Sequence, residues 1–374
     1  MRDIHVEVEV KPLSYEVRIG TDILKEMTEE LVKHPLGKRY AVITDSKVAE
    51  LHGHRLMECL QNAGVKCWMF VFPEGEASKN RDMKEELEDA MLEAGFGRDC
   101  AVIALGGGVV GDLAGFVAAT YMRGVPVLQI PTTTLSMADS AIGSKTAVDV
   151  PYGKNLIGAF HSPEAVYMDM QMLSTLDERN YYAGLVELIK HGFIRRPSLQ
   201  EYLEEHKAVI TAREGDTYAP VMEELFFQNS EVKNDVVSHD QKESNLRKIL
   251  NYGHTLGHGV ELVSDFELIH GECVAVGIAF AAFLAVELGY ADESWEKTQV
   301  ETLRAYHQAC RIPENLSTDD ILAAMKKDKK VRDGKIEFIL LSGPGQIVQR
   351  ENGDYGIPVE ETVLREKIEK FRKK

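Results

Sequence analysis

Histidine and acidic residues with the spacing of a metal site lie in the second half of the chain. His254 and His258 are four residues apart, which places both imidazoles on one face of a helix. His270 follows after an apolar stretch, and Glu187 in AGLVELIKHG is an acid that could complete the set. Two imidazoles and a carboxylate, with room left for substrate oxygens, suit a catalytic divalent metal. The sequence therefore predicts a metal site, with an ordinary surface or core histidine pair as the alternative.

Polar residues continue the histidine pattern toward the N-terminus. Arg247, Asn251, His254 and His258 recur at intervals of three or four residues, so they would form one stripe of a continuous helix. Apolar residues flank them, and a polar stripe on such a helix needs a polar ligand to face. We therefore expect this helix to line a binding site.

A glycine-rich motif, GGGVVGD from Gly106 to Asp112, follows the apolar run AVIAL. Glycine lets the backbone approach a phosphate closely, and a helix N-terminus offers N–H groups and a positive dipole to a pyrophosphate. The spacing matches G-x-G-x-x-G, but the motif does not follow the first strand, and no acid lies about twenty residues later. We expect a phosphate loop in a different dinucleotide-binding arrangement, with a purely structural turn as the alternative.

Further polar candidates follow predicted strands or lie in the stretch 129–160. Asp45, after a strand at 40–44, is placed to accept hydrogen bonds from a ribose diol, and 73–79 forms a turn before a helix. The stretch 129–160 supplies Thr132, Thr133, Asp139, Lys145, Lys154 and Asn155. Lysines beside glycines in a loop suit phosphate or carboxylate binding, with ordinary exposed lysines as the alternative. A lysine cluster at 326–330, taken alone, is typical of a solvated helix face.

The elements that position these residues change in type near the middle of the chain. Strands expected at 15–19, 40–44, 65–72, 101–105 and from 125 onward alternate with helices, which predicts a parallel sheet covered on both faces. Ligands of such sheets bind at the carboxyl ends of the strands. From Leu176 onward the pattern is helical. We therefore predict an α/β N-terminal domain and a mostly α-helical C-terminal domain.

Size and charge narrow the classes of function. The chain has 374 residues, enough for two cores, and a net charge of −17, which disfavours nucleic acid and anionic membranes as partners. An anionic substrate would need a local basic pocket. Five cysteines without paired spacing and no visible signal peptide favour a cytoplasmic protein. The apolar run 273–286 is too short to span a bilayer and predicts a core helix.

Six stretches together resemble the successive motifs of the 3-dehydroquinate synthase family, from about Asp45 to Leu341. They are GGGVVGDLAGFVAATYMRG, IPTTTLSMADSAIGSKTAVDVPYGKNLIGAF, AGLVELIKHG, LRKILNYGHTLGHGVE, HGE and MKKDKK. The resemblance implies a Rossmann-like NAD-binding domain over 1–170, a helical metal- and substrate-binding domain over 171–374, and an active site between them.

The activity implied by this resemblance is the conversion of 3-deoxy-D-arabino-heptulosonate 7-phosphate, a phosphorylated seven-carbon sugar acid, to 3-dehydroquinate and phosphate. This is a step of the shikimate route to aromatic amino acids. Transient oxidation by NAD, phosphate elimination, re-reduction and intramolecular aldol closure would follow in that order. The resemblance also implies a homodimer, with Arg123 near the partner's site.

Residue roles come from the same resemblance. A zinc or cobalt ion would be held by Glu187, His254 and His270. NAD would be contacted by Asp45, Glu76, Lys79, Gly108, Val109, Val110, Gly111, Asp112, Thr132, Thr133, Lys145, Lys154 and Thr175. The substrate pocket would comprise Arg123, Asp139, Lys145, Lys154, Asn155, Lys190, Lys233, Arg247, Asn251, His258, Lys329 and Lys330.

Two other enzyme classes remain open, and Ser144, Asp149 and Asn245 depart from the family pattern. A related sugar phosphate cyclase would act on sedoheptulose 7-phosphate or glucose 6-phosphate, which lack the carboxylate that Arg247, Lys233 and Asn251 suit. A metal-dependent polyol or glycerol-phosphate dehydrogenase would share the glycine loop but carry out net redox chemistry. Ser144 stands where the family often has glycine, so its hydroxymethyl group could reshape the pocket.

Overall fold

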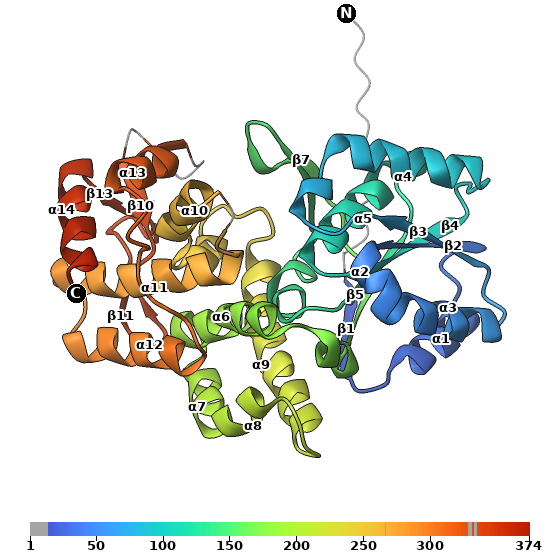
Figure 1. Cartoon of the computed structure of the whole chain (residues 1–374), viewed down its shortest axis with the longest axis horizontal. Helices are drawn as coiled ribbons and strands as arrows, with labels where there is room; N and C mark the ends of the chain where they lie inside the picture. The colour runs from blue at the N-terminus through green and yellow to red at the C-terminus, as the bar shows by residue number, and fades with distance from the viewer. Residues whose placement is uncertain (1–13, 266, 328–330, 333–334) are drawn as a thin grey trace, which may run out of the picture.

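A six-stranded parallel sheet forms the centre of the N-terminal half in the computed structural model, which describes residues 14–265, 267–327, 331–332 and 335–374. The strands are β1 (Glu16–Gly20), β2 (Arg39–Asp45), β3 (Cys67–Phe72), β4 (Cys100–Gly106), β5 (Val127–Pro131) and β8 (Ala165–Asp169). Their order across the sheet is β1-β8-β5-β4-β2-β3, with every described pairing parallel (Figure 1). The predicted parallel sheet is confirmed, and β8 was not expected from the sequence.

Helices cover both faces of this sheet because strand side chains alternate between the faces. Val42 and Ile103 belong to the core beneath α1 (Leu24–Lys33) and α3 (His54–Asn62). Their neighbours Ala41 and Val102 belong to the core beneath α4 (Arg81–Glu93) and α5 (Gly108–Thr120). We call residues 14–169, which contain this sheet, the α/β part.

The direction of the chain reverses between β2 and β4. From β2 the chain continues to β3 at the sheet edge, whereas from β4 it continues to β5 on the opposite side. A crevice forms at the carboxyl ends of two strands whose connections diverge in this way, and ligands of open α/β sheets bind there. Asp45 ends β2 and Gly106 ends β4, so both lie at this crevice.

A β-hairpin replaces the loop that was expected around Lys145 and Lys154. Its strands are β6 (Lys145–Val150) and β7 (Gly153–Phe160), which pair antiparallel and project beside the helical half (Figure 1). The loop prediction was wrong because alternate residues of β6 pack on α5: a Cβ on Gly115 would lie 2.5 Å from Thr146 Cγ2. Both lysines are therefore carried by paired strands.

Helices dominate residues 170–374, which we call the helical part. Its helices are α6 (Glu178–Ile194), α7 (Pro197–Glu205), α8 (Lys207–Ala212), α9 (Tyr218–His239), α10 (His254–Val263), α11 (His270–Glu287), α12 (Glu293–Ala305), α13 (Thr318–Lys327) and α14 (Glu361–Arg372). Short strands lie among the last helices: β9 (Val331–Arg332), β10 (Lys335–Phe338), β11 (Leu341–Gly343), β12 (Gln346–Ile347) and β13 (Ile357–Val359). The prediction of a mostly helical second half is confirmed.

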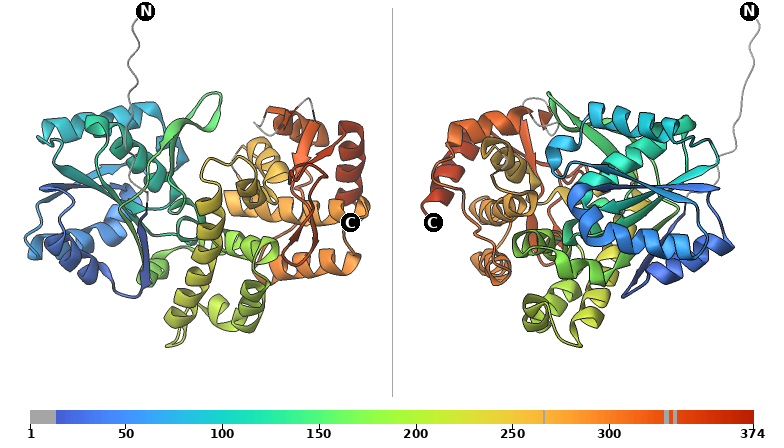
Figure 2. Two further views of the ribbon diagram at one scale, coloured as in Figure 1. Left: turned by 180° about the vertical axis from the view of Figure 1, so that it is seen from behind. Right: turned by 45° about the vertical axis from the view of Figure 1, so that its right-hand side comes forward.

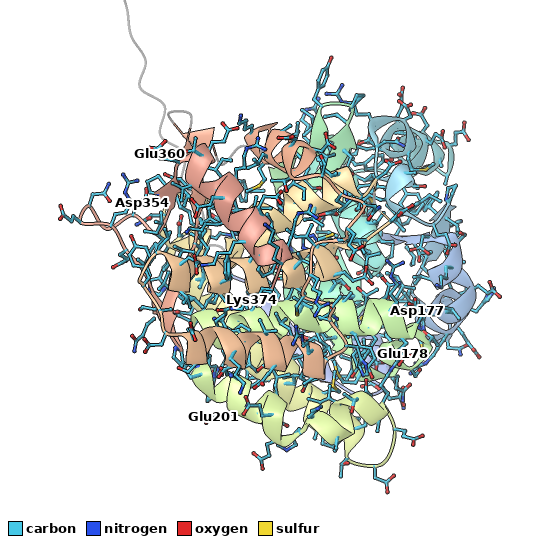
Figure 3. The ribbon with its side chains drawn as sticks, turned by 60° about the vertical axis from the view of Figure 1, so that its left-hand side comes forward. Asp177, Glu178, Glu201, Asp354, Glu360 and Lys374 are labelled. Atoms are coloured by element: carbon cyan, nitrogen blue, oxygen red, sulfur yellow. The ribbon has the colours of Figure 1, made fainter. Side chains whose placement is uncertain are left out.

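Two long helices connect the halves. Figure 2 shows α9 standing between the α/β part and the remaining helices. The start of α6, marked by Asp177 and Glu178 in Figure 3, lies on the side of the α/β part, and Asp177 caps it by accepting from the backbone N–H of Asn180 at 3.0 Å. These helices hold the halves in one arrangement.

The apolar segment predicted as a core helix is α11. By length and composition alone it is apolar enough to cross a membrane, but 78% of this helix is buried inside the protein. Its neighbours include α6, α10 and α12, so its apolar surface serves as the core of the helical part. The core-helix prediction is confirmed.

The histidine stretch is not one continuous helix. Residues Leu246–Asn251 form a 3-10 helix, η6, and α10 begins only at His254. Between them Gly253 has φ 81°, and a Cβ there would lie 2.5 Å from Ile278 Cγ1. The predicted single stripe is therefore wrong for Arg247 and Asn251, because close packing against α11 requires a left-handed glycine that ends one helix and starts the next.

Gly184 provides a test of the contact between the two parts. A Cβ on this residue of α6 would lie 2.0 Å from Thr134 Oγ1 and 2.3 Å from the backbone nitrogen of Leu135. We expect Gly184→Ala to lower the free energy of unfolding by about 1–3 kcal/mol, because the backbone on one side must move. Urea titration measures this change.

Gly97→Ala is the matched control for this test. There the added Cβ would meet only the side-chain oxygen Oδ1 of Asp99, at 3.2 Å, and that side chain can move aside. An equal loss of stability in both variants would contradict a specific contact at Gly184.

Candidate active site

Glu187, His254 and His270 meet in the structure as the sequence predicted. Oε1 of Glu187 lies 3.7 Å from Nε2 of His254 and 3.7 Å from Nε2 of His270. One side-chain donor atom from each of the three residues lies within 4.8 Å of the other two. Because α6, α10 and α11 each supply one residue, the packing of three helices fixes this geometry.

Glu187 is the most constrained of the three. It is fully buried, and its Oε2 accepts a hydrogen bond from Lys190 Nζ, one turn later on α6. Among the described residues its Oε1 finds no hydrogen-bond partner. Burial alone would raise the pKa of this carboxyl, but Lys190 and His270 lower it to about 2. The result is a buried anionic oxygen directed at two imidazoles, which suits a bound cation.

Hydrogen bonds set the orientation of both histidine rings. Nδ1 of His254 donates to the carbonyl oxygen of Tyr252 at 3.2 Å, and Nδ1 of His270 lies 3.4 Å from Oε2 of Glu261. A donor proton on Nδ1 leaves a lone pair on Nε2, the atom that faces Glu187. Burial lowers the pKa of His270, but the two flanking carboxylates raise it to about 9. Positive charge is therefore favoured at this place.

A second possible ligand group shares one of these histidines. His258, Glu261 and His270 also bring donor atoms within 4.8 Å of one another. In that group, however, Glu261 already accepts from Lys154 and faces His270, whereas Oε1 of Glu187 has no such bond among the described residues. A third group consists of Asp139, Glu187 and His191, but its Asp139 already accepts from Lys233, so the first group fits a metal ion best.

Basic side chains of the helical part and the hairpin gather near the triad, and two of the lysines are paired with acidic groups. Lys233 Nζ donates to Asp139, and burial lowers the pKa of this lysine. Lys145 Nζ lies 2.5 Å from Oε2 of Glu243, whose other oxygen accepts from Asn251 Nδ2 at 2.7 Å. Arginine 247 and His258 also belong here: Arg247 donates to the carbonyl of Gly143 at 3.1 Å, and the ring of His258 lies 5.2 Å from that of His254. The predicted residues of the helical part and the hairpin thus converge.

The predicted nucleotide residues gather at the carboxyl ends of β2, β4 and β5. Gly108 to Asp112, including Val109, Val110 and Gly111, form the first turn of α5, and the backbone N–H of Thr132 donates to the carbonyl of Gly106 at 3.0 Å. Thr133 packs on the same loop, since a Cβ on Gly107 would lie 3.2 Å from its Cγ2. Close packing, not left-handed backbone, requires glycine here.

Lys79 connects this loop to the hairpin. Its Nζ lies 2.6 Å from Oδ2 of Asp112, 2.6 Å from Oδ1 of Asn155 and 4.0 Å from Glu76. Although burial lowers the pKa of this lysine, Asp112 and Glu76 raise it. The ammonium group is therefore charged at the helix N-terminus, a suitable arrangement for phosphate.

Two further predicted residues lie near the end of β2. Asp45 uses Oδ1 to accept from the backbone N–H of Val48 at 2.9 Å, and burial raises the pKa of its carboxyl. Thr175 lies beside the segment that follows, with its Oγ1 2.7 Å from Nε2 of His52. Asp45 and Thr175 therefore belong to the same region of the sheet.

Three predicted residues do not join this arrangement in the described structure. Arg123 is exposed just past α5, at the end opposite the glycine loop, and a helix of this length separates its ends by about 20 Å. The arginine thus lies apart from the pocket of its own chain. Lys329 and Lys330 fall outside the described residues.

Ser144, where the family often has glycine, adopts a left-handed backbone conformation. Its φ is 64°, and its Oγ lies 2.6 Å from Oγ of Ser162. The hydroxyl therefore pairs with a neighbouring serine.

Sequence reasoning missed several polar groups of the site. Glu261 follows His254 by seven residues, a spacing that indicates the same helix face and could have revealed it. Asp240 accepts backbone N–H bonds from Ser244, Asn245 and Arg247 at 2.7, 2.8 and 3.0 Å. No sequence pattern identifies a carboxylate that binds the backbone N–H groups of the loop after it.

His191 is another buried group that the sequence did not reveal. It is fully buried on α6, and its Nδ1 lies 2.6 Å from Oδ1 of Asn229. Burial lowers its pKa to about 4, so the ring is neutral.

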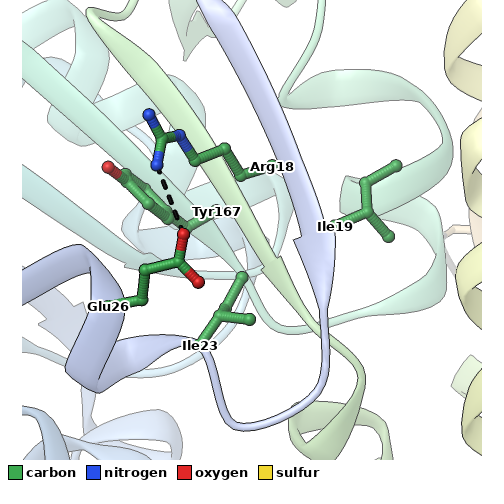
Figure 4. Close-up of a pocket in the computed structure, with 5 residues that line it drawn as sticks. All are labelled: Arg18, Ile19, Ile23, Glu26 and Tyr167. Carbon is green, nitrogen blue, oxygen red and sulfur yellow. Dashed lines mark hydrogen bonds and ion pairs between the residues drawn. The ribbon is translucent and has the colours of Figure 1, made fainter.

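A surface hollow elsewhere does not involve these residues. It has a volume of about 330 Å³ and is lined by Arg18, Ile19, Ile23, Glu26 and Tyr167, beside β1 (Figure 4). Arg18 spans it to reach Glu26 at 3.5 Å. Among the predicted site residues that the structure describes, none lines this hollow.

The fold and the site together define a class of enzyme that is built from the α/β part and the helical part. A metal-type triad of the helical part lies beside a hairpin of the α/β part, which also carries the glycine-rich loop at the start of α5. Comparison with known proteins narrows this class. The family model described as 3-dehydroquinate synthase N-terminal matches residues 69–183, and that described as 3-dehydroquinate synthase C-terminal matches residues 184–331. The chain belongs to the 3-dehydroquinate synthase family.

Individual relatives agree with this family. The chain is 43% identical over 345 residues to the 3-dehydroquinate synthase of Thermoanaerobacter pseudethanolicus, covering 91% of this chain and 95% of the relative. A solved 2-deoxy-scyllo-inosose synthase, complexed with carbaglucose-6-phosphate, NAD+ and Co2+, has a TM-score of 0.86 at 28% identity, covering 96% of this chain and 97% of the other. The 2-epi-5-epi-valiolone synthase of Streptomyces hygroscopicus, solved with NAD+ and Zn2+, has a TM-score of 0.83 at 27% identity, covering 98% of each chain.

Asp240 generates a prediction about stability and pH. Burial would raise the pKa of its carboxyl, but the backbone N–H bonds hold it below its ordinary value. We expect Asp240→Asn to lower the free energy of unfolding at pH 7 by about 1–3 kcal/mol, because these donors lose a charged acceptor. The native state binds this proton less readily than the unfolded chain, so the contribution is present above about pH 4 and is lost as the pH falls further.

Urea unfolding at pH 7 and at decreasing pH tests this prediction. The difference between the parent protein and Asp240→Asn should shrink as the pH falls below about 4. Asp235→Asn, which removes a partly exposed partner of Arg195, is the control and should change stability by less than about 1 kcal/mol. A constant difference for Asp240→Asn at all pH values would contradict the assignment.

Proposed function

We propose that this protein is a 3-dehydroquinate synthase, which converts 3-deoxy-D-arabino-heptulosonate 7-phosphate to 3-dehydroquinate and phosphate in the shikimate route. The observation that carries the proposal is the orphaned Oε1 of Glu187, directed at two Nε2 atoms, one of which belongs to a histidine that Glu261 connects to Lys154 of the α/β part. The relatives with this name support it over more than nine-tenths of the chain.

Glu187, His254 and His270 would hold a divalent ion, zinc or cobalt. The metal supplies a Lewis acid that stabilises negative charge developing on substrate oxygens. Lys190 keeps Glu187 ionised and in place, while Tyr252 and Glu261 keep the imidazoles turned with Nε2 toward the ion. Ligand type and orientation therefore fit the metals named for the solved relatives.

NAD would bind across the crevice between β2 and β4. Gly108 to Asp112 would present backbone N–H groups to its pyrophosphate, with Asp45 facing a ribose. Lys79, Thr132, Thr133, Thr175 and Glu76 surround the same crevice. Bound NAD would supply reversible hydride transfer, so the overall reaction would involve no net oxidation.

The substrate would occupy the space between the hairpin and the triad. Its phosphate and carboxylate carry about three negative charges near neutral pH. Lys145, Lys154, Lys190, Lys233 and Arg247 would offset this charge, although the chain as a whole carries −17. The combination of Arg247, Lys233 and Asn251 favours a substrate with a carboxylate over the sugar phosphates of other cyclases, which have a phosphate but no carboxylate.

The protein's own groups would mainly orient one substrate through several chemical steps. Charged partners on both sides fix the phosphate and the carboxylate, so that the ring atoms between them meet the metal and the cofactor in one pose. Elimination of phosphate, ring opening and aldol closure then proceed without release of an intermediate.

We also propose a domain boundary, a cellular location and an oligomeric state for the protein. We place the boundary between the NAD-binding and the metal-binding domain near residue 170, and the protein in the cytoplasm as a homodimer without nucleic-acid or membrane partners. Arg123, exposed at the far end of α5, would then serve the site of the partner subunit.

Phosphate and NADH measured together test the activity. With the proposed substrate, NAD and zinc or cobalt, we expect phosphate to be released over many turnovers while NADH absorbance stays flat, because the hydride returns. NADH accumulating in proportion to substrate consumed would instead establish a dehydrogenase. If neither signal appears, the synthase assignment fails and other sugar phosphates become the candidates.

His254→Ala tests the metal site. We expect it to lose bound metal and to reduce turnover by at least about 100-fold, because an imidazole ligand is removed. Metal content after gel filtration and turnover measure these effects. His239→Ala, which removes an exposed histidine of α9, is the control and should keep the metal.

His258→Ala distinguishes the triad from the group formed by His258, Glu261 and His270. It should retain the metal if Glu187, His254 and His270 are the ligands, and lose it if His258 is one of them. A His254→Ala variant with stoichiometric metal and normal turnover would remove His254 from the site.

A further inference from the structure

Glu261 joins two functional groups that belong to different parts of the protein. It lies on α10, only 7% exposed. Its Oε1 accepts a hydrogen bond from Lys154 Nζ at 2.9 Å, and its Oε2 faces Nδ1 of His270 at 3.4 Å. Lys154 comes from β7 of the α/β part, and His270 begins α11 of the helical part. One buried carboxylate thus connects an anion-binding lysine to a metal ligand.

We propose that Glu261 couples the anion pocket to the metal: when a bound anion draws Lys154 away, Glu261 binds His270 more firmly and the metal is held more tightly. This inference rests on the proposed metal site. It concerns a positioning residue, because Glu261 acts through His270 and does not itself bind the ion.

Competition between two donors gives the coupling its direction. A lysine ammonium at 2.9 Å makes a charge-assisted bond and withdraws negative charge from the carboxylate. The bond from His270 to the same carboxylate is long, at 3.4 Å, so it can shorten when the lysine leaves. An imidazole whose Nδ1 proton is held by a carboxylate is a stronger donor through Nε2, which raises metal affinity.

Lys154 is placed to change partners. Its Nζ lies 3.6 Å from Oε1 of Glu76 as well as 2.9 Å from Glu261, and its side chain is one-third exposed on the projecting hairpin. Burial lowers the pKa of this lysine, but Glu76 and Glu261 raise it, so the group is charged. A phosphate or carboxylate that enters between the hairpin and α10 competes with these carboxylates for the ammonium group.

Both carboxylate oxygens of Glu261 already have partners, which argues against Glu261 as a metal ligand. Glu261 belongs with His258 and His270 to the second cluster of possible donors. To bind an ion there it would have to give up Lys154 and its contact with His270 Nδ1. Its role is therefore to orient His270.

Zinc affinity of the full-length protein without substrate tests the coupling. Competition against a chelator would be measured for the parent protein, Glu261→Gln, Lys154→Met and the double variant. We expect Glu261→Gln to weaken zinc binding by about 10–100-fold. Lys154→Met should strengthen zinc binding at least about fivefold, and only when Glu261 is present.

Lys154→Met could strengthen zinc binding equally in the parent protein and in the Glu261→Gln variant. That result would show a through-space charge effect and overturn the proposal. Lys145→Met is the matched control, because its partner Glu243 lies outside all three possible ligand groups, and its zinc affinity should equal that of the parent. If Glu261→Gln does not fold by circular dichroism, an unchanged affinity of Lys154→Met still overturns the coupling.

Two further results separate this inference from the proposed function. A changed Co2+ absorption spectrum in Glu261→Gln, indicating a changed ligand set, would make Glu261 a ligand and overturn its positioning role alone. A parent protein that binds neither zinc nor cobalt would overturn the metal site and the inference with it.

Discussion

The buried carboxylate of Glu187 is the constraint on which the arrangement of the site depends. A fully buried anion is costly unless positive charge lies beside it. Lys190 on the same helix satisfies one oxygen, and the other faces only the two Nε2 atoms. Three helices must therefore keep their positions to within a fraction of an ångström. Gly253 and α11 secure that packing, since a single added methyl group at residue 253 would meet the backbone of α11.

Opposite charges are also paired at other positions around the site. Lys233 with Asp139, Lys145 with Glu243, and Lys154 with Glu261 are pairs in which a basic group that suits an anionic substrate is held by a nearby acid. These pairs keep the cations ordered within a strongly acidic protein. An arriving phosphate or carboxylate exchanges one anionic partner for another, so the pocket is largely organised before the ligand binds.

Much of the fold and part of the candidate site could be predicted from the sequence, because these features depend on local periodicity. Buried β-branched runs identified the parallel strands, and the four-residue spacing of His254 and His258 identified the helix that carries them. The glycine loop was recognised from its G-x-G-x-x-G spacing directly after an apolar strand. Resemblance to a family then connected Glu187 with histidines more than sixty residues away, a relation that spacing alone does not establish.

The remaining features depend on contacts between distant segments. The break at Gly253 arises from packing against α11, and the hairpin around Lys145 and Lys154 arises from packing on α5. Glu261 was overlooked because its role is defined by Lys154, which lies 107 positions away in sequence. Arg123 shows the converse: a residue assigned by resemblance lies away from the pocket of its own chain.

The most direct test of this account is the position of the metal itself. Crystals grown with zinc or cobalt would be measured at the absorption edge of that element, so that anomalous scattering locates the ion. We expect one strong peak within about 2.0–2.2 Å of Oε1 of Glu187 and of Nε2 of His254 and His270. A peak bound instead by His258 and Glu261, or no peak near Glu187, would contradict the account.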